Sequence, residues 1–164
     1  MSKSEWNAIV QNLERQDIHR MLRSGMAEEM ALEVRNLCLE YIAADTEKRR
    51  FMKSAITQQA SPVVLHFTSR MATLAMQRGD KEAIDLGLAA FDLSNIMLID
   101  PRDSFGPIGR LAFAAEQCDV DLLDRATVII GGISPQLMQV FTGPKPAQVE
   151  RDAEGNLCFG TPGQ

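Results

Sequence analysis

The sequence predicts an all-α protein, either stacked antiparallel helical hairpins in about three units, as in an α-solenoid, or an irregular helical bundle. Three observations predict this class. Apolar residues recur at helical spacing, turns rich in Gly and Asp separate the helical stretches, and similar segments return after 35 to 40 residues. We expect a helical domain over residues 1–142 and a Pro/Gly-rich tail over residues 143–164.

The central hairpin, residues 62–95, shows the helical pattern most clearly. Ser61 is the expected N-cap of its first helix, with Pro62 at the first helical position. Gly79 is suited to end this helix at about residue 78, and Asp80 to cap the next one, over residues 81–95. The core that we predict from the apolar stripes consists of Phe67, Met71, Leu74, Ile84, Leu88, Leu111 and Ile129.

Helices are also expected on both sides of this hairpin. The first segment begins at the expected N-cap Ser4 and ends at Gly25, as one bent helix or two short ones. A longer helix follows over residues 27–44, and Asp45 restarts a helix that continues to about Gln58. A third hairpin covers residues 107–131 with a turn near residues 118–119. A short helix that begins at Ser134 would cover the open end of the stack.

Internal similarity favours the stacked arrangement. Arg35 with Asp45-Thr46-Glu47 matches Arg70 with Asp80-Lys81-Glu82 at an offset of 35, and residues 110–117 resemble residues 70–77 at an offset of 40. Two-helix units of this length are typical of helical solenoids, and the layout resembles HEAT and tetratricopeptide repeat proteins in general form, without their consensus residues. The alternative is chance similarity, because Asp-x-Glu is common capping chemistry and Ala/Leu-rich helices align easily.

Two segments are expected to be irregular. Residues 101–106, Pro-Arg-Asp-Ser-Phe-Gly, form the longest predicted connection in the helical region, either a functional loop or a spacer. In the tail, residues 149–151 and 157–159 flank a turn-forming sequence, which predicts a short β-hairpin or a disordered segment.

Composition and charge exclude several classes of protein. Hydrophobic residues make up 45% of the chain and charged residues 24%, as in ordinary globular domains. Three cysteines without a close pair indicate a reducing compartment and no disulfide framework. The first residues lack the apolar core of a signal peptide, and no apolar run is long enough to span a membrane. We therefore expect a soluble cytoplasmic protein, whose net charge of -5 disfavours nonspecific nucleic-acid binding.

No catalytic residue, metal ligand or cofactor site is predicted. The sequence contains no phosphate-binding Gly-x-x-x-x-Gly-Lys, no Gly-x-Ser-x-Gly and no Cys-x-x-Cys. The two histidines, His19 and His66, are too few for a histidine-rich metal site. Most carboxylates fall where helix caps and solvated faces are expected.

Two groups of side chains could bind a partner. The polar strip consists of Arg70, Gln77, Arg110, Phe113 and Gln117, which stacked hairpins would bring onto one solvent-reachable face. Arginine and aromatic side chains are favoured at protein interfaces. The cation cluster consists of Lys48, Arg49, Arg50 and Lys53, which could contact phosphate or an acidic partner. Both groups also fit ordinary solvated helix faces.

The function that we expect is a non-enzymatic cytoplasmic module that binds another protein or a peptide, as an adaptor or a small inhibitor. The first alternative is an enzyme that binds a small molecule or nucleotide between helices near residues 100–110, with Arg102, Asp103, Arg110 and His66 as its polar groups. The second alternative is nucleic-acid binding through the cation cluster. The sequence also leaves a homo-oligomer open. An open groove would favour the binding module, and a closed pocket with convergent charges the enzyme.

Overall fold

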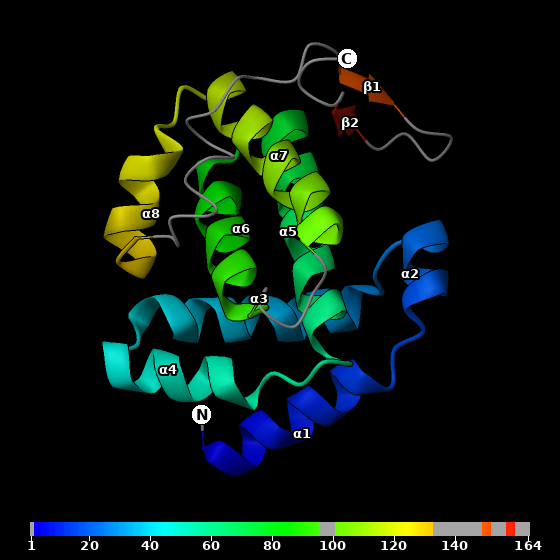
Figure 1. Ribbon diagram of the computed structural model, residues 1–164, viewed down its shortest axis with the longest axis vertical. Coiled ribbons are helices and arrows are strands. Elements are labelled where there is room, and N and C mark those ends of the chain that lie inside the picture. The colour runs from blue at the N-terminus through cyan, green and yellow to red at the C-terminus, as the bar shows by residue number, and fades with distance from the viewer. Residues whose placement is uncertain (1, 96–100, 133–148, 152–156, 160–164) are drawn as a thin grey trace.

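Helices make up most of the described chain, in a computed structural model that describes residues 2–95, 101–132, 149–151 and 157–159 (Figure 1). The eight helices of these residues are α1 (Lys3–Glu14), α2 (Ile18–Ser24), α3 (Glu28–Ala43), α4 (Thr46–Ala55), α5 (Ser61–Arg78), α6 (Lys81–Leu93), α7 (Pro101–Gln117) and α8 (Leu122–Ile130). The all-α class is confirmed. No helix of the described residues is long and apolar enough to cross a membrane.

Two short strands follow the helices. β1 (Val149–Arg151) pairs antiparallel with β2 (Leu157–Phe159), and β2 lies against α7. These strands are the two triplets that the tail sequence indicates.

Aspartate side chains explain where four of the helices begin. The first backbone N–H groups of α2, α4, α6 and α8 donate to Asp17, Asp45, Asp80 and Asp121. The turns expected near residues 44–45, 79–80 and 118–119 are confirmed. Gly79 ends α5 with a φ of 63°, a left-handed conformation that glycine adopts without a steric penalty.

The start of α1 differs from the prediction. Ser2 is the N-cap, in place of Ser4, and it forms a capping box with Glu5, in which each side chain accepts the other residue's backbone N–H. Ser-x-x-Glu is the sequence signature of this motif. Because Ser2 and Glu5 satisfy two N–H groups together, α1 begins two residues earlier than a cap at Ser4 would allow.

The start of α5 also differs. Ser61 is the first residue of the helix, and the N-cap is Ala60, which makes no side-chain cap hydrogen bond. The hydroxyl of Ser61 is buried and donates to the carbonyl oxygen of Ser94, at the end of α6. Because Ser61 already lies inside the helix, its hydroxyl serves this tertiary hydrogen bond in place of a cap. Ser61 therefore joins α5 to α6.

α7 corrects the prediction of an irregular connection. Residues 101–106 are the first part of α7, which begins at Pro101. Proline suits the first position of a helix, since the N–H that it lacks has no intrahelical partner there. Pro101 thus begins a helix, and the predicted start of the third hairpin at Pro107 lies inside α7. The expected helical residues 96–100 and 133–142, including the short helix at Ser134, lie outside the described residues.

The second and third hairpins lie side by side. α5 packs along both α6 and α7, and α6 packs against α8 (Figure 1). Arg125 of α8 forms an ion pair with Asp85 of α6. In contrast, α3 and α4 lie across the lower ends of α5 and α6 (Figure 1). The first hairpin therefore does not continue the stack, and the described helices form a bundle.

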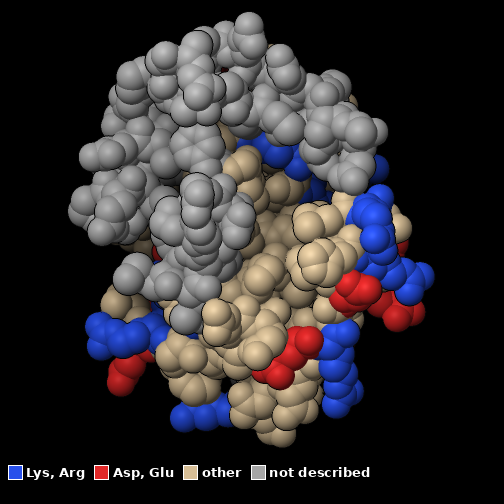
Figure 2. Space-filling view, turned by 45° about the vertical axis from the view of Figure 1, so that its right-hand side comes forward, with Lys and Arg blue, Asp and Glu red and all other residues tan. Residues whose placement is uncertain are grey.

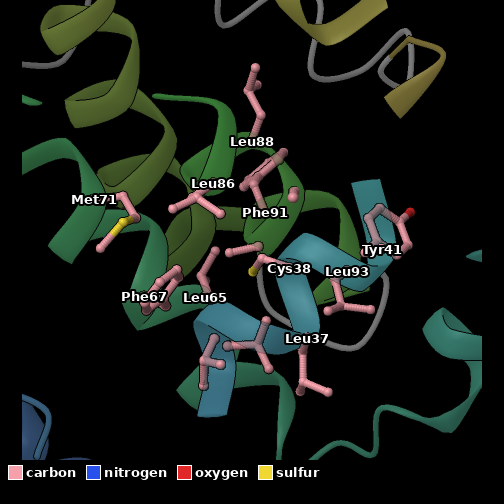
Figure 3. Packing of buried hydrophobic residues seen from close by; sticks show 14 of the residues in the cluster. Leu37, Cys38, Tyr41, Leu65, Phe67, Met71, Leu86, Leu88, Phe91 and Leu93 are labelled. Carbon is pink, nitrogen blue, oxygen red and sulfur yellow. The ribbon is translucent and has the colours of Figure 1, made fainter. Parts of the chain in front are cut away.

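α3, α5 and α6 supply the centre of the hydrophobic core. Figure 3 shows their side chains gathered in one cluster, which includes Leu37, Leu65 and Phe91. The predicted core residues that are buried are Phe67, Met71, Ile84, Leu88, Leu111 and Ile129. The prediction is wrong for Leu74, which is partly exposed because it lies at the edge of a surface hollow next to α2.

Gly87 allows α5, α6 and α7 to approach one another closely. A Cβ atom at this position would lie 2.7 Å from Cδ1 of Leu111 and 3.4 Å from Cβ of Met71. The absent side chain leaves room for Leu111 of α7 between α5 and α6. The hydroxyl of Thr68 also donates to the carbonyl oxygen of Gly87 at 3.2 Å. This packing fixes the position of α7 beside α5.

Candidate functional site

A hollow of about 430 Å³ lies between α2, α5 and α7. α2 and the turn after it provide Met21, Leu22, Arg23, Ser24, Gly25 and Met26, α5 provides His66, Ser69, Arg70, Thr73 and Leu74, and α7 provides Arg110. We call it the arginine hollow, because three helices each contribute one arginine. Among the described residues, no carboxylate and no cysteine lines it.

Arg70 connects the arginine hollow to the start of α3. Its Nη1 donates to the backbone oxygen of Met26 at 3.2 Å, and its Nη2 lies 2.6 Å from Oε1 of Glu28. The Arg70 side chain is 26% exposed, whereas that of Glu28 is 87% exposed. Arg70 is thus a half-buried cation, and Glu28, the carboxylate that pairs with it, lies almost entirely in solvent.

Arg110 is the most deeply placed cation of the hollow. Its residue is only 7% exposed, and Nη2 donates to the hydroxyl of Thr73 on α5. The Thr73 hydroxyl in turn donates to the backbone oxygen of Ser69 at 3.1 Å. These two hydrogen bonds orient the guanidinium and hold α7 against α5 at this point.

His66 lies in the same hollow and is held in its neutral form. Burial lowers the pKa of His66 from its ordinary value of 6.5, and the positive charges of Arg110 and Arg70 lower it further. The imidazole therefore carries no charge at neutral pH. Protonation would become easier if an anion entered the hollow, because an anion would offset the two guanidinium charges.

The structure brings together only part of the predicted polar strip. Arg70 and Arg110 line the arginine hollow, whereas Gln77 and Gln117 are exposed near the C-terminal ends of α5 and α7, and Phe113 is half-buried. The expectation of one continuous solvent-reachable face is wrong at Arg110, which is buried because α7 packs beside α5. A role of the five residues in binding stays a prediction.

The cation cluster largely holds helices together. Lys48 and Lys53 form ion pairs with Glu40 of α3 and Asp92 of α6, at 3.0 and 3.5 Å. Arg49 donates to backbone carbonyl oxygens in the last turns of α3 and α8, at distances of 2.6 to 2.8 Å. These three cations thus have partners within the fold, which reduces the positive charge that a nucleic acid would meet.

The polar groups proposed for the enzyme alternative are only partly placed. His66 and Arg110 share the arginine hollow, whereas the side chains of Arg102 and Asp103 lie outside the described residues. The described residues also contain no group of three or more His, Cys, Asp and Glu side chains that could hold a metal ion.

The contribution of α2 to this site was not predicted. Leu22, Arg23 and Ser24 lie more than forty residues before Arg70 in the chain, and no motif in the sequence links them to it. The signal available in the sequence is weak: Gly25 and the break in the apolar stripe before Asp17 indicate a short separate helix, but not where that helix packs. No family model matches the chain, and neither the curated proteins nor the solved structures contain a significant match to it.

Proposed function

We propose that this chain is a non-enzymatic cytoplasmic module that binds another protein or a peptide through the arginine hollow and the surface around it. The observation that carries the proposal is the lining of the hollow, to which α2, α5 and α7 each contribute an arginine beside leucine side chains. Arginine is enriched at protein interfaces.

The surroundings of the hollow support binding to a macromolecule. Leu22, which lines it, is 51% exposed, so an apolar side chain is available to a partner at the rim. Figure 2 shows one face of the molecule, on which Lys, Arg, Asp and Glu lie beside an area of uncharged side chains.

The alternative is an enzyme that acts on a small molecule in the same hollow. It is favoured by His66, whose lowered pKa leaves the imidazole able to accept a proton at neutral pH. The lining residues of the described chain include no carboxylate or thiol to act with His66. A binding module needs only the arginine and leucine side chains that line the hollow. An enzyme would also need a carboxylate or thiol beside His66, and the described lining residues include neither.

The test is capture of a partner by the full chain. The tagged wild-type protein and two variants, Arg70→Gln and Arg78→Gln, are incubated with native cytoplasm, and retained proteins are identified by mass spectrometry. Arg78 is a matched control, because it is an exposed arginine at the end of the same helix. We expect a protein that wild type and Arg78→Gln retain and Arg70→Gln does not. The dissociation constant with the purified partner should rise about tenfold, the loss of one charge-assisted hydrogen bond. Equal retention by all three proteins would exclude the hollow as the binding site.

A further inference from the structure

We propose that α2 is a lid over the arginine hollow, which opens and closes on its own while the other helices stay packed, and so controls access to the covered face of α5. This inference rests on the proposed function only in taking the hollow as the site that a partner reaches. The reasons are the position of α2, the weakness of the contacts that hold it there and the backbone conformation of Gly25.

The first reason is that α2 covers one face of α5. The α5 residues that line the hollow are His66, Ser69, Arg70, Thr73 and Leu74. They follow one another at helical spacing, which puts them on the same side of α5, and all of them are half-buried. The other described lining residues belong to the C-terminal half of α2 or to the turn after it, apart from Arg110 of α7. Displacement of α2 would therefore uncover this face of α5.

The second reason is that little holds α2 in place at the outer edge of the bundle (Figure 1). Met21 is the only buried residue of α2, Ile18 is partly buried, and the other residues of the helix are exposed. In the part of the chain that the structure describes, no side chain of α2 forms a hydrogen bond or an ion pair with another helix.

A helix as short as α2 depends on its packing for stability. Its seven residues are too few to stay helical in water alone, so the helix depends on the burial of Met21. A segment with so few buried contacts opens at a lower free energy than the packed bundle does. We therefore expect α2 to unfold locally whenever Met21 leaves its position.

The chain is anchored on both sides of α2. Leu13, near the end of α1, is fully buried. After α2, the side chain of Arg70 donates to the backbone oxygen of Met26 at 3.2 Å. Between these anchors lie Asp17, the exposed N-cap of α2, and Gly25. A change of backbone conformation near these two residues moves α2 and leaves α1 and α3 in place.

The third reason is that Gly25 sets the closed position of α2. Its φ of 83° and ψ of 171° form a combination that essentially only glycine adopts. A Cβ atom at Gly25 would meet no described atom within 4 Å, its chain neighbours aside. Alanine would therefore strain the backbone of the closed lid without a clash, and the open lid would relieve that strain. Gly25→Ala should thus shift the equilibrium toward the open state.

The first experiment measures amide hydrogen exchange by NMR in the full-length protein. The reporters are the amides of α2, such as that of Met21, which donates to the oxygen of Asp17 at 3.0 Å. We expect them to exchange faster than the amides in the middle of α5, and Gly25→Ala to speed them about tenfold without a change in α5. Gly106→Ala is the matched control, because a Cβ atom there also meets no described atom within 4 Å and Gly106 has no positive φ.

The second experiment tests whether the opening of α2 uncovers α5. Ser69→Cys introduces a thiol on the covered face, and a polyethylene-glycol maleimide too large for the closed hollow is the probe. Mass spectrometry locates the label, and Cys118, which is half-buried just after α7, reports any loosening of the whole bundle. Gly25→Ala should speed labelling at position 69 about tenfold relative to Gly106→Ala, without a change at Cys118.

A second pair of variants acts on the packing of α2 in place of the backbone. Met21→Ala removes the buried side chain of the lid, whereas Arg20→Ala changes an exposed neighbour in the same helix. Met21→Ala should speed exchange in α2 and labelling at position 69, and Arg20→Ala should match wild type. If Gly25→Ala does not fold, as judged by circular dichroism, this pair decides the matter.

Several outcomes would overturn the inference. Exchange of the α2 amides at the rate of those in α5, or an equal effect of Gly25→Ala on both helices, would show that α2 does not open on its own. Labelling at position 69 that responds to neither Gly25→Ala nor Met21→Ala would show that α2 does not control access. A partner whose capture depends on Arg70, together with either result, would leave the proposed function standing without the lid. A lid that opens as expected, with no captured partner, would do the reverse.

Discussion

Arg125 of α8 and Asp85 of α6 form a two-point ion pair, with Nε to Oδ1 at 3.0 Å and Nη2 to Oδ2 at 2.8 Å. Both side chains are partly exposed, at 36% and 23%, so solvent reduces the strength of the pair. The geometry nevertheless requires a planar guanidinium, which lysine cannot replace. The pair thus links α8 of the third hairpin to α6 of the second.

The first prediction concerns this pair. Arg125→Lys should lower the free energy of unfolding by about 0.5 to 1 kcal/mol, the upper range for exposed ion pairs. Arg78→Lys, at an exposed position on α5, should change it by less than about 0.5 kcal/mol. Urea denaturation of both variants measures the difference. A double-mutant cycle with Asp85→Asn should give a coupling free energy of similar size, and a coupling near zero would contradict the assignment.

The second prediction concerns Arg49. This side chain donates to the carbonyl oxygens of Tyr41, Ile42 and Ile129, which belong to the last turns of α3 and α8. Arg49→Ala should lower the free energy of unfolding by about 2 to 4 kcal/mol, because it removes charge-assisted hydrogen bonds and leaves two helix ends without this donor. Arg50→Ala, at the exposed neighbouring position, is the control and should cost less than about 0.5 kcal/mol. Similar costs for both variants would mean that Arg49 is an ordinary surface cation.

The third prediction separates two leucines that the sequence pattern treats alike. Leu88 is fully buried in α6, so Leu88→Ala should cost about 2 to 5 kcal/mol through lost apolar burial and the cavity that remains. Leu74 is partly exposed at the edge of the arginine hollow, and Leu74→Ala should cost about 1 kcal/mol. Chemical denaturation measures both values. A larger loss for Leu74→Ala than for Leu88→Ala would contradict the placement of Leu74.

Local chemistry along the chain predicts most of the fold. Asp45 and Asp80 cap helices as their positions before apolar periodic segments indicate, and Gly79 ends α5. The second and third hairpins lie side by side, as the similarity of their sequences indicates, and Arg125 of α8 pairs with Asp85 of α6. Helical periodicity and capping depend on neighbours within a few residues, so a single sequence contains this information.

The arginine hollow could be predicted only in part, because it depends on how distant segments pack. The similarity between residues 70–77 and 110–117 puts Arg70 and Arg110 near each other, as the structure confirms. The depth of Arg110 depends on the close approach that Gly87 allows, and the presence of Arg23 depends on where α2 packs. Neither follows from periodicity. The irregular connection predicted over residues 101–106 is wrong for a local reason, since proline is common both after the end and in the first turn of a helix, and Pro101 begins α7.

The fourth prediction concerns pH and His66. Burial, Arg110 and Arg70 hold the pKa of His66 below 6.5 in the folded protein, whereas the unfolded chain has the ordinary value. Below about pH 6.5 the unfolded chain therefore binds a proton that the folded protein does not, and this favours unfolding. His66 should thus lower the free energy of unfolding as the pH falls from 6.5 toward its folded pKa, and have little effect above pH 7.

Urea denaturation of wild type, His66→Gln and His19→Gln at about pH 7.5 and about pH 5.5 isolates this contribution from that of the carboxylates. The loss of stability between the two pH values should be smaller for His66→Gln than for wild type. His19 is exposed, so His19→Gln should lose as much as wild type. A loss in His66→Gln equal to or greater than that of wild type would mean that the pKa of His66 is not lowered in the folded protein.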